Sequence, residues 1–426
     1  MNAEPGNINQ LTEHLFRRES GKMLSVLVRI FGTAHLQLAE DVVQDTLLQA
    51  LETWKLRGIP DNPAAWLHRA ARNKAIDQLR RGRHQIHFDH TDEERPLLES
   101  GYTMGPVMDS YWNELTMEDD LLRMMYACCH KDLPAESQIT LMLKTLCGFS
   151  IAETARALLT TEDAINKRLY RTREFFRQNR IRPSFPPPAA LSVNTAPVLR
   201  SIYLLFNEGY APTHGSELMR REVMNEAIYL CSMLCRNEHT QQTEAFAALA
   251  LMQFHAARAD SRTDDNGDVI LLQDQDRATW DQQLIREGIH NLEQSAGGDT
   301  ISRYHVEAAI AYEHCKATKF ADTNWQRILA LYDMLVLISP TAIVHLNRMA
   351  VYRQVHGDEQ TLAQIRLSPY IKEWEGNYLY HCLLAEIHLA SAPKTAINCF
   401  RQALAIVKQP AERRYITEKM ATIQDV

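Results

Sequence analysis

A helical repeat of apolar residues runs through almost the whole of this 426-residue chain. Apolar side chains recur at helical spacing, and we find no series of alternating strands and no Gly-bearing hairpin turns. A repeat of about 3.6 residues places one apolar stripe along a helix, whereas a strand needs a repeat of two. The pattern therefore predicts an all-α protein.

Two segments break the helical pattern. HTDEERPLLESGYTMGP, which begins at His90, is acidic and contains Pro and Gly, and RPSFPPPAAL, which begins at Arg182, is rich in Pro. Such composition is typical of linkers. We expect a helical block over 8–89, an acidic flexible linker over 90–114, a second helical block over 115–182, a Pro-rich linker over 183–190 and a helical extension over 191–426.

Charge is unevenly distributed along the chain. The formal net charge is −7, yet Asp77 is the only acidic residue between Ala64 and Arg83, a stretch rich in Arg. A local basic face can bind a polyanion despite an acidic total. No apolar run approaches the roughly 18 residues of a membrane span. The N-terminus shows no secretion signal, and the eight Cys lie scattered in helical segments. We expect a cytoplasmic protein with reduced, mostly buried thiols.

The basic stretch 64–83 is predicted to form a helix with two different faces. Pro63, with Asn62 or Asp61 before it, is a typical helix start. One arc is apolar, and the opposite arc consists of Trp66, Arg69, Asn73, Asp77 and Arg80. Cations suit phosphates, Asn and Asp can read base edges, and an indole can stack on an unpaired base. The alternative is a solvated helix face with one half-buried Trp.

An acidic helix is predicted just before it, over 39–54. One side carries Val43, Leu47, Ala50, Leu51 and Trp54, which we expect to be buried. The other side is acidic and surrounds one exposed Leu; it consists of Asp41, Asp45, Leu48 and Glu52. Because an acidic row repels DNA, a functional role for it would be contact with a basic protein partner. An ordinary solvated face is the alternative.

Residues 148–177 have the pattern of a helix-turn-helix. Ser150 and Glu153 have capping-box spacing, and Thr161 stands as the N-cap of a second, longer helix. The second helix is expected to bury Ile165, Leu169, Thr172 and Phe176 and to direct outward Asp163, Ala164, Lys167, Tyr170 and Arg171. A basic second helix after a tight turn suits entry into a major groove. A plain αα-hairpin would show the same buried positions.

Taken in this order, DVVQDTLLQALETW, AWLHRAARNKAIDQLRRGR and GFSIAETARALLTTEDAINKRLYRTR resemble a bacterial extracytoplasmic-function sigma factor of the sigma-70 family. The resemblance covers about residues 8–182. The remainder, with FNEGYAPTHG, LLQDQDRATWD and the CCH at Cys128, is similar to the subgroup that carries a C-terminal extension of tetratricopeptide-like helices. One departure is Leu159, because many members of the family have Gly at that position in the turn.

The resemblance implies a protein that binds core RNA polymerase, recognises the minus-thirty-five and minus-ten promoter elements, and melts the duplex at the minus-ten element, so that its DNA partners are the promoter duplex and the melted non-template strand. The loop Gly58–Asn62 would receive a flipped base. The polymerase-binding residues implied are Asp41, Gln44, Asp45, Leu48 and Glu52. The minus-ten residues implied are Trp66, Arg69, Asn73, Asp77, Arg80 and Arg81. The minus-thirty-five residues implied are Thr161, Ala164, Lys167, Arg168 and Arg171.

The extension carries a loose repeat of paired helices. Ala396, Phe400 and Ala403 have the spacing of the second helix of a tetratricopeptide unit, with Tyr380 before them. Such a stack would bind a protein partner or make a regulatory intramolecular contact through 191–426, and an irregular stabilising domain is the alternative. The polar stretches Asn207–Tyr210 and Asp274–Arg277 have no explanation at this level.

The sequence shows no motif for catalysis. The chain has no phosphate-binding Gly-rich loop, no nucleophile elbow and no CxxC, so we expect no enzyme, no cofactor and no metal, despite the run His84, His87, His90 and the pair Cys129, His130. Two rival functions remain open. One is a stand-alone helix-turn-helix regulator, and the other is a tetratricopeptide adaptor that does not bind DNA.

Overall fold

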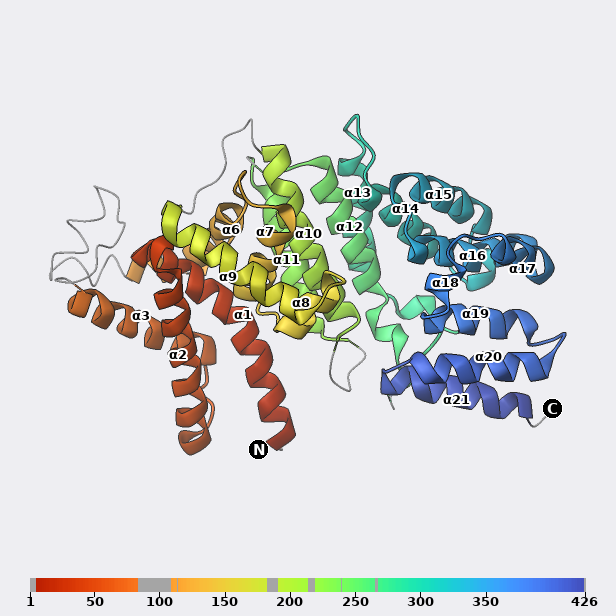
Figure 1. Ribbon diagram of the computed structural model, residues 1–426, viewed down its shortest axis with the longest axis horizontal. Coiled ribbons are helices and arrows are strands. Elements are labelled where there is room, and N and C mark those ends of the chain that lie inside the picture. The colour runs from red at the N-terminus through yellow and green to blue at the C-terminus, as the bar shows by residue number, and fades with distance from the viewer. Residues whose placement is uncertain are drawn as a thin grey trace. The chain divides into compact units, whose positions relative to one another are not determined.

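The computed structural model describes residues 5–82, 109–112, 114–181, 191–213, 219–238, 240–264 and 267–424. Over these ranges the chain is helical and forms no strand, apart from an isolated antiparallel bridge between Thr263 and Val269 (Figure 1). The predicted all-α class is therefore confirmed. The expected Pro-rich linker, most of the acidic linker and the three histidines His84, His87 and His90 lie outside the described residues.

The chain divides by its internal contacts into two compact units. Unit 1 comprises 1–208, 225–230 and 237–240, and unit 2 comprises 209–224, 231–236 and 241–426. The helices of unit 1 are α1 (Pro5–Phe31), η1 (Thr33–His35), α2 (Leu36–Arg57), α3 (Pro63–Gly82), α6 (Glu114–Ala127), α7 (Ala135–Leu141), the π-helix η2 (Met142–Leu146), α8 (Ile151–Ala157), α9 (Glu162–Asn179) and most of α10 (Leu191–Tyr210).

The next helix, α11 (Arg221–Arg236), supplies residues to both units. The remaining helices belong to unit 2. They are α12 (Thr243–Ala257), η4 (Ala259–Arg262), η5 (Arg277–Thr279), α13 (Gln282–Ser295), α14 (Arg303–Lys316), η6 (Phe320–Asp322), α15 (Trp325–Ile338), α16 (Ala342–His356), α17 (Asp358–Arg366), α18 (Ile371–Trp374), α19 (Tyr378–His388), α20 (Pro393–Ile406) and α21 (Pro410–Gln424).

Helix α1 is the centre of unit 1. Every residue from Gly21 to Val28 is buried, whereas a surface helix would leave part of its circumference in water. The reason is that α1 packs against α2 and α3 and also against α6 and η2. Gly21 permits the closest of these approaches, because a Cβ there would overlap the carbonyl oxygen of Leu146. One helix thus joins segments that lie far apart in sequence.

Helix α10 also belongs to this unit through specific contacts. The Tyr126 hydroxyl lies 2.8 Å from the Thr195 hydroxyl in a buried position. Arg200 donates to Glu136 at 3.2 Å. The first part of the helical extension expected over 191–426 therefore packs with α6 and α7.

In unit 2, helices that follow one another in sequence pack together. Helix α12 packs against α13 and α14, α15 against α16, and α19 against α20. The predicted core positions Ala396, Phe400 and Ala403 are 0%, 1% and 0% exposed, which confirms their burial. Phe400 and Ala403 share an apolar cluster with Ala385 and Ile416. The tetratricopeptide class of these hairpins stays a prediction.

The two unexplained polar stretches have structural roles in unit 2. Arg277 donates to the carbonyls of His314 and Ala317 at 2.9 and 3.0 Å, so it satisfies orphan acceptors at the end of α14. Gly209 accepts a 2.7 Å hydrogen bond from the Arg220 amide, and a Cβ at Gly209 would lie 2.7 Å from the Met224 nitrogen. Arg277 therefore fixes the backbone at the end of α14, and Gly209 allows the close approach of the backbone at the start of α11.

The cysteines and the helix lengths agree with the expectations from sequence. All eight Cys are unbridged, as expected. Burial raises the pKa of Cys129 and of Cys147 to about 12 in each case, so these thiols are poor nucleophiles. No helix in the described ranges combines the length and the apolar character that crossing a membrane requires.

Candidate polymerase and nucleic-acid interface

Helix α2 presents the predicted acidic face to solvent. Asp41, Gln44, Asp45 and Glu52 are exposed, and Leu48 among them is 58% exposed. The opposite side is buried through Val42, Val43, Thr46, Ala50 and Trp54. Two expected core residues are not buried: Leu47 is half-buried, and Leu51 is 36% exposed and lies at the edge of the acidic face. The face therefore combines carboxylates with exposed apolar surface, as a protein-docking surface does.

Helix α3 has the two faces that the sequence predicted. Its start is capped by Asn62, whose side-chain oxygen accepts the Ala65 amide at 3.0 Å. The apolar arc of Leu67, Ala71, Ala75 and Leu79 is buried. On the opposite arc the following residues are exposed: Arg69, Asn73, Asp77, Arg80 and Arg81.

Trp66 differs from its neighbours on that arc because it is half-buried. Its ring meets the buried Trp54 ring edge-on, with centroids 5.5 Å apart and planes at 66°. The Trp54 ring also packs against Phe16, with the two ring centroids 5.7 Å apart. Trp66 is therefore held at one edge by the core, and the part that remains exposed lies on the face of the exposed cations.

The helix-turn-helix is formed by α8, a tight turn and α9. The predicted capping box is present: the Glu153 amide donates to the Ser150 hydroxyl at 3.1 Å, and the Ser150 amide donates to the Glu153 carboxylate at 2.7 Å. Thr161 caps α9 by accepting the Ala164 amide at 3.3 Å. Leu159 in the turn has φ +50° and is 93% exposed. The turn thus keeps the left-handed backbone that Gly adopts most readily.

Helix α9 buries the four predicted core residues and leaves a partly basic outward face. Ile165, Leu169, Thr172 and Phe176 are buried. Of the five predicted minus-thirty-five residues, Thr161, Lys167 and Arg171 are exposed, and Ala164 and Arg168 are half-buried. Arg168 lies 3.6 Å from Glu136 of α7, and Lys167 lies 3.7 Å from Asp163. These two cations already have carboxylate neighbours.

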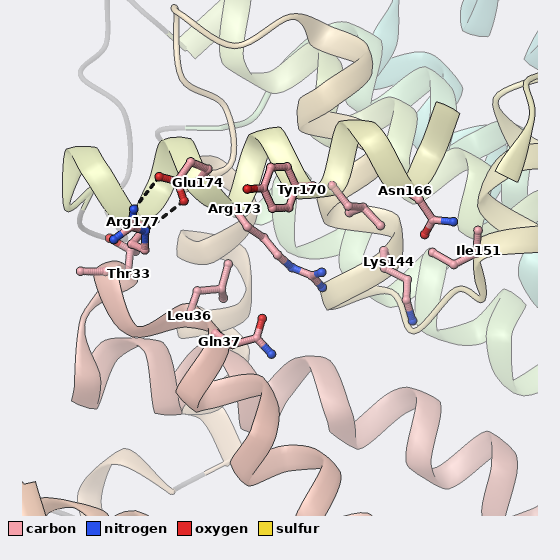
Figure 2. A pocket seen from close by; sticks show the side chains of 12 residues that line it. Thr33, Leu36, Gln37, Lys144, Ile151, Asn166, Tyr170, Arg173, Glu174 and Arg177 are labelled. Atoms are coloured by element: carbon pink, nitrogen blue, oxygen red, sulfur yellow. Dashed lines mark hydrogen bonds and ion pairs between the residues drawn. The ribbon is translucent and has the colours of Figure 1, made fainter. Parts of the chain in front are cut away.

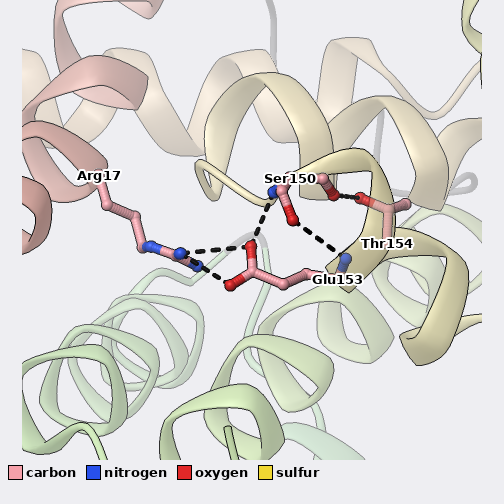
Figure 3. A network of polar contacts seen from close by, with 4 residues as sticks. All are labelled: Arg17, Ser150, Glu153 and Thr154. Atoms are coloured by element: carbon pink, nitrogen blue, oxygen red, sulfur yellow. Dashed lines mark hydrogen bonds and ion pairs between the residues drawn. The ribbon is translucent and has the colours of Figure 1, made fainter. Parts of the chain in front are cut away.

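Charge pairs connect α1–α3 with the segment that begins at Asp109. Arg17 of α1 donates to both oxygens of Glu153 in α8, at 2.9 and 3.2 Å (Figure 3). Arg29 of α1 donates to Asp120 of α6 at 3.2 Å. Arg173 of α9 donates to Glu40 of α2 at 2.8 Å. Sequence reasoning missed these pairs, because their partners lie 91 to 136 residues apart.

The carboxylates of these pairs are electrostatically distinct. Burial by itself would raise the pKa of Glu153, but the Arg17 charge and the hydrogen bonds from Ser150 lower it to about 2. For Glu40 the balance is the reverse: burial raises its pKa, and the charge of Arg173 opposes that rise only in part. The charged form of Glu153 is therefore strongly favoured in its pair. The charged form of Glu40 is disfavoured by burial, although it is paired with Arg173.

A pocket of about 390 Å³ lies between α9 and the segment of η1 and the start of α2. Figure 2 shows Tyr170, Arg173 and Arg177 on the α9 side, with Thr33 and Gln37 opposite them. Lys144 also lines the pocket, and burial together with the charge of Arg173 lowers its pKa. Arg177 is engaged by Glu174 at 2.5 Å.

The arrangement gives no support for a metal centre. In the described part of the chain, no group of three His, Cys, Asp or Glu side chains is placed to hold a metal ion. Cys129 donates its thiol to the Met125 carbonyl at 3.6 Å, and the His130 ring packs 5.0 Å from that of Phe175. Cys129 is thus buried in the core of unit 1, and His130 is half-buried at its edge.

Comparison with known families assigns these segments. Residues 15–85 match the model of sigma-70 region 2, and residues 123–176 match that of sigma-70 region 4. The chain belongs to the sigma-70 family. It is an extracytoplasmic-function sigma factor with a C-terminal extension. Residues 194–296 of the extension match a family of unknown function, DUF6596.

Two relatives bear on this sigma factor. An uncharacterized protein, R00370 of Rhizobium meliloti (strain 1021), is 31% identical over 397 residues, 92% of this chain and 91% of the relative. The ECF RNA polymerase sigma factor SigL of Mycobacterium tuberculosis (strain H37Rv) is 29% identical over 161 residues, 38% of this chain and 83% of the relative. No solved structure matches. Family membership gives this sigma factor core RNA polymerase and promoter DNA as partners.

Proposed function

We propose that this sigma factor directs core RNA polymerase to promoters with minus-thirty-five and minus-ten elements and opens the DNA at the second of them. The observation that carries the proposal is the combination, on segments matching regions 2 and 4, of an acidic face on α2, a basic face on α3 and a helix-turn-helix. A stand-alone DNA-binding regulator has no use for the acidic face. An adaptor without DNA binding has no use for the other two.

The acidic face on α2 is the proposed polymerase contact. Its carboxylates, Asp41, Asp45 and Glu52, are exposed around Leu48, so the surface can exclude water at its centre and attract cations at its rim. Such charge complementarity sets the orientation of docking and its rate more than its affinity. The basic partner would be a surface of the polymerase core.

The basic face of α3 is the proposed contact with the melted minus-ten strand. Arg69, Arg80 and Arg81 are exposed for phosphates, and Asn73 and Asp77 stand beside them for base edges. The half-buried Trp66 offers a partly exposed ring whose position is fixed by Trp54. Stacking on an aromatic ring contributes about 1–3 kcal/mol per base, which offsets much of the cost of unstacking. The loop Gly58–Asn62 follows α2 and is the proposed place of the flipped base.

Helix α9 is the proposed minus-thirty-five reader. Thr161, Lys167 and Arg171 are exposed along one side of it, with the small Ala164 between them. This arrangement suits entry of the N-terminal half of α9 into a major groove. Helices of the extension would then regulate the two promoter-binding regions, through a protein partner or an intramolecular contact.

The test is transcription from a pool of the host's upstream fragments by core polymerase with the full-length protein. Start sites that share two spaced motifs are the expected result. The variant Asp45→Lys/Glu52→Lys should lose polymerase binding, and Glu293→Lys/Asp299→Lys, which changes exposed acidic residues of unit 2 by the same charge, should retain it. Equal binding by both variants would refute the docking surface.

A second test separates melting from DNA binding. Trp66→Ala should slow strand opening more than closed-complex formation, whereas Trp66→Phe keeps an aromatic ring against Trp54 and should open promoters at an intermediate rate. Tight binding to duplex promoter without polymerase, and no opening with it, would favour the stand-alone regulator. Absence of any salt-dependent DNA affinity would favour the adaptor.

A further inference from the structure

A pocket of about 420 Å³ lies wholly within unit 2, outside the segments that match sigma-70 regions 2 and 4. It is formed by the loop at Leu271, the end of α14, the start of α15 and one side of α16. Helix α14 packs against α15, and α15 against α16 (Figure 1). We call this pocket the α16 groove. Its two walls differ in chemistry, because one is aromatic and the other carries amides.

The aromatic wall consists of Phe320, Trp325 and Tyr332, with His314 beside them. The Trp325 ring centroid lies 5.0 Å from that of Phe320 and 5.5 Å from that of His314. Aromatic rings in such tilted contacts hold one another in place. The wall is therefore a fixed apolar platform.

Arg277 holds the two segments that carry this platform. Its guanidinium donates to the His314 carbonyl at 2.9 Å and to the Thr323 hydroxyl at 3.0 Å. The Thr323 carbonyl in turn accepts the Trp325 amide at 2.9 Å. Because Arg277 is only 6% exposed, these bonds are shielded from water. A platform that is ordered before binding loses less conformational entropy when a ligand docks.

The α16 groove is uncharged. No Asp, Glu, Lys or Arg lines it. Burial and the charges of Arg258 and Arg277 lower the pKa of His314 to about 3, so its imidazole is neutral at pH 7. Burial and the nearby Glu307 raise the pKa of Tyr332 to about 12, so its phenol keeps the proton. The charge of the groove is thus complementary to an uncharged partner, and its hydroxyl and amide groups can donate to acceptors on that partner.

The amide wall is one side of α16. Asn347, Ala350 and Gln354 line the groove and are exposed. Within the described part of the chain, neither the Asn347 nor the Gln354 side chain has a hydrogen-bond partner. Residues seven positions apart share a helix face, and they lie about 10.5 Å apart along the axis at 1.5 Å per residue. The small Ala350 between them leaves room for a backbone to approach the helix.

The spacing of these two amides distinguishes between peptide conformations. A polyproline II helix repeats every three residues, or about 9.3 Å, and its carbonyls have no internal hydrogen bonds. An extended strand repeats the same face every two residues, or about 6.7 Å. The amide spacing therefore fits one polyproline II turn to about 1 Å and does not fit the strand. Proline-rich segments dock in aromatic-lined grooves, because their conformation is already ordered before binding.

We propose that the α16 groove binds a proline-rich segment of a partner protein in the polyproline II conformation. The proline rings lie against Phe320 and Trp325, and carbonyls one turn apart accept from the amides of Asn347 and Gln354. The partner's segment is uncharged where it crosses the groove. This inference goes beyond the proposed function and stands on unit 2 alone, since it requires neither promoter recognition nor polymerase binding.

The experiment titrates the full-length protein into a dye-labelled, C-terminally amidated decaproline peptide and follows fluorescence anisotropy. Saturable binding is expected, together with no binding of a labelled Gly-Ser decapeptide, which is uncharged but flexible. Equal binding of both peptides would overturn the proposal. So would saturable binding of adenine, a neutral planar molecule, by protein that does not bind decaproline, because the groove would then be a small-molecule site. Neither polymerase nor DNA is present, so failure here leaves the proposed function intact.

Substitutions on α16 test the register. Asn347→Asp with Gln354→Glu removes both amide donors at nearly constant shape and should weaken decaproline binding about 30-fold, about fivefold for each hydrogen bond lost. Ala350→Leu, at an exposed position of a helix, should weaken it about tenfold or more by filling the space between the amides. The matched control is Gln360→Glu with Gln364→Glu, exposed amides of α17 outside the groove. Unchanged affinity in both α16 variants, or an equal loss in the control, would refute the assignment.

Discussion

The structure predicts how much the ion pair between Arg17 and Glu153 contributes to stability. The pKa of Glu153 falls from its ordinary 4.5 to about 2, which corresponds to about 3 kcal/mol at about 1.4 kcal/mol per pKa unit. The hydrogen bonds from Ser150 supply part of this shift, so only the remainder belongs to the Arg17 charge. We assign about 2 kcal/mol to the Arg17 charge.

The perturbation is Arg17→Met, which removes the charge and keeps most of the aliphatic packing beside Phe149. The matched variant is Glu153→Gln, because Gln at this position preserves the capping box. Hydrogen exchange over residues 151–179, followed by mass spectrometry, reports the local opening free energy. For Arg17→Met at pH 7 we expect exchange about 30-fold faster, the equivalent of about 2 kcal/mol.

The pH dependence follows from the direction of the pKa change. A carboxylate whose folded pKa is depressed contributes stability that is fully present above the unfolded value of 4.5 and is lost as pH falls toward about 2. The effect of Arg17→Met should therefore be smaller at pH 3 than at pH 7, and it should largely vanish in the Glu153→Gln background. An exchange rate within twofold of wild type at pH 7, or an undiminished effect in the Gln background, would refute the assignment.

Three further predictions concern backbone and core. Leu159→Gly should raise the free energy of unfolding by up to about 1 kcal/mol, because Leu159 is exposed and has a left-handed backbone that Gly adopts without strain. Leu159→Ala keeps a Cβ in that conformation and should not raise it. Gly148→Ala should destabilise by more than Gly58→Ala, since both have positive φ but only Gly148 is closely approached; equal losses in urea titrations would contradict this. Phe176→Ala should cost about 3–5 kcal/mol by the same titrations, because Phe176 is 0% exposed.

The sequence predicted the parts of this molecule that depend on local spacing. The faces of α3 and α9 follow from which residues repeat every three to four positions, and the Ser150 and Thr161 caps depend on neighbours three residues away. Leu51 was misplaced because a helical wheel assigns an angle but does not show how far the packing neighbours reach. The roles of the predicted site residues in promoter and polymerase binding stay predictions.

The long-range features could not be read from the sequence. Glu153 was recognisable as a capping residue, but its second role as the partner of Arg17 depends on how α1 and α8 meet. Likewise, the sequence around Gly209 and Arg277 does not indicate which backbone groups these residues contact in unit 2. For a residue such as Glu153, which makes both a local and a long-range contact, the sequence indicates only the local contact.

The continuous burial of α1 has a practical consequence for dissecting this protein. Residues 21–28 contact partners around the whole helix, so a fragment cut after region 2 would carry an uncovered apolar stripe on its most central helix. Exposed stripes of this kind promote self-association. Poor solubility of such a fragment would therefore report a missing neighbour and not a misfolded region 2, and polar substitutions chosen to cure it would damage the intact protein.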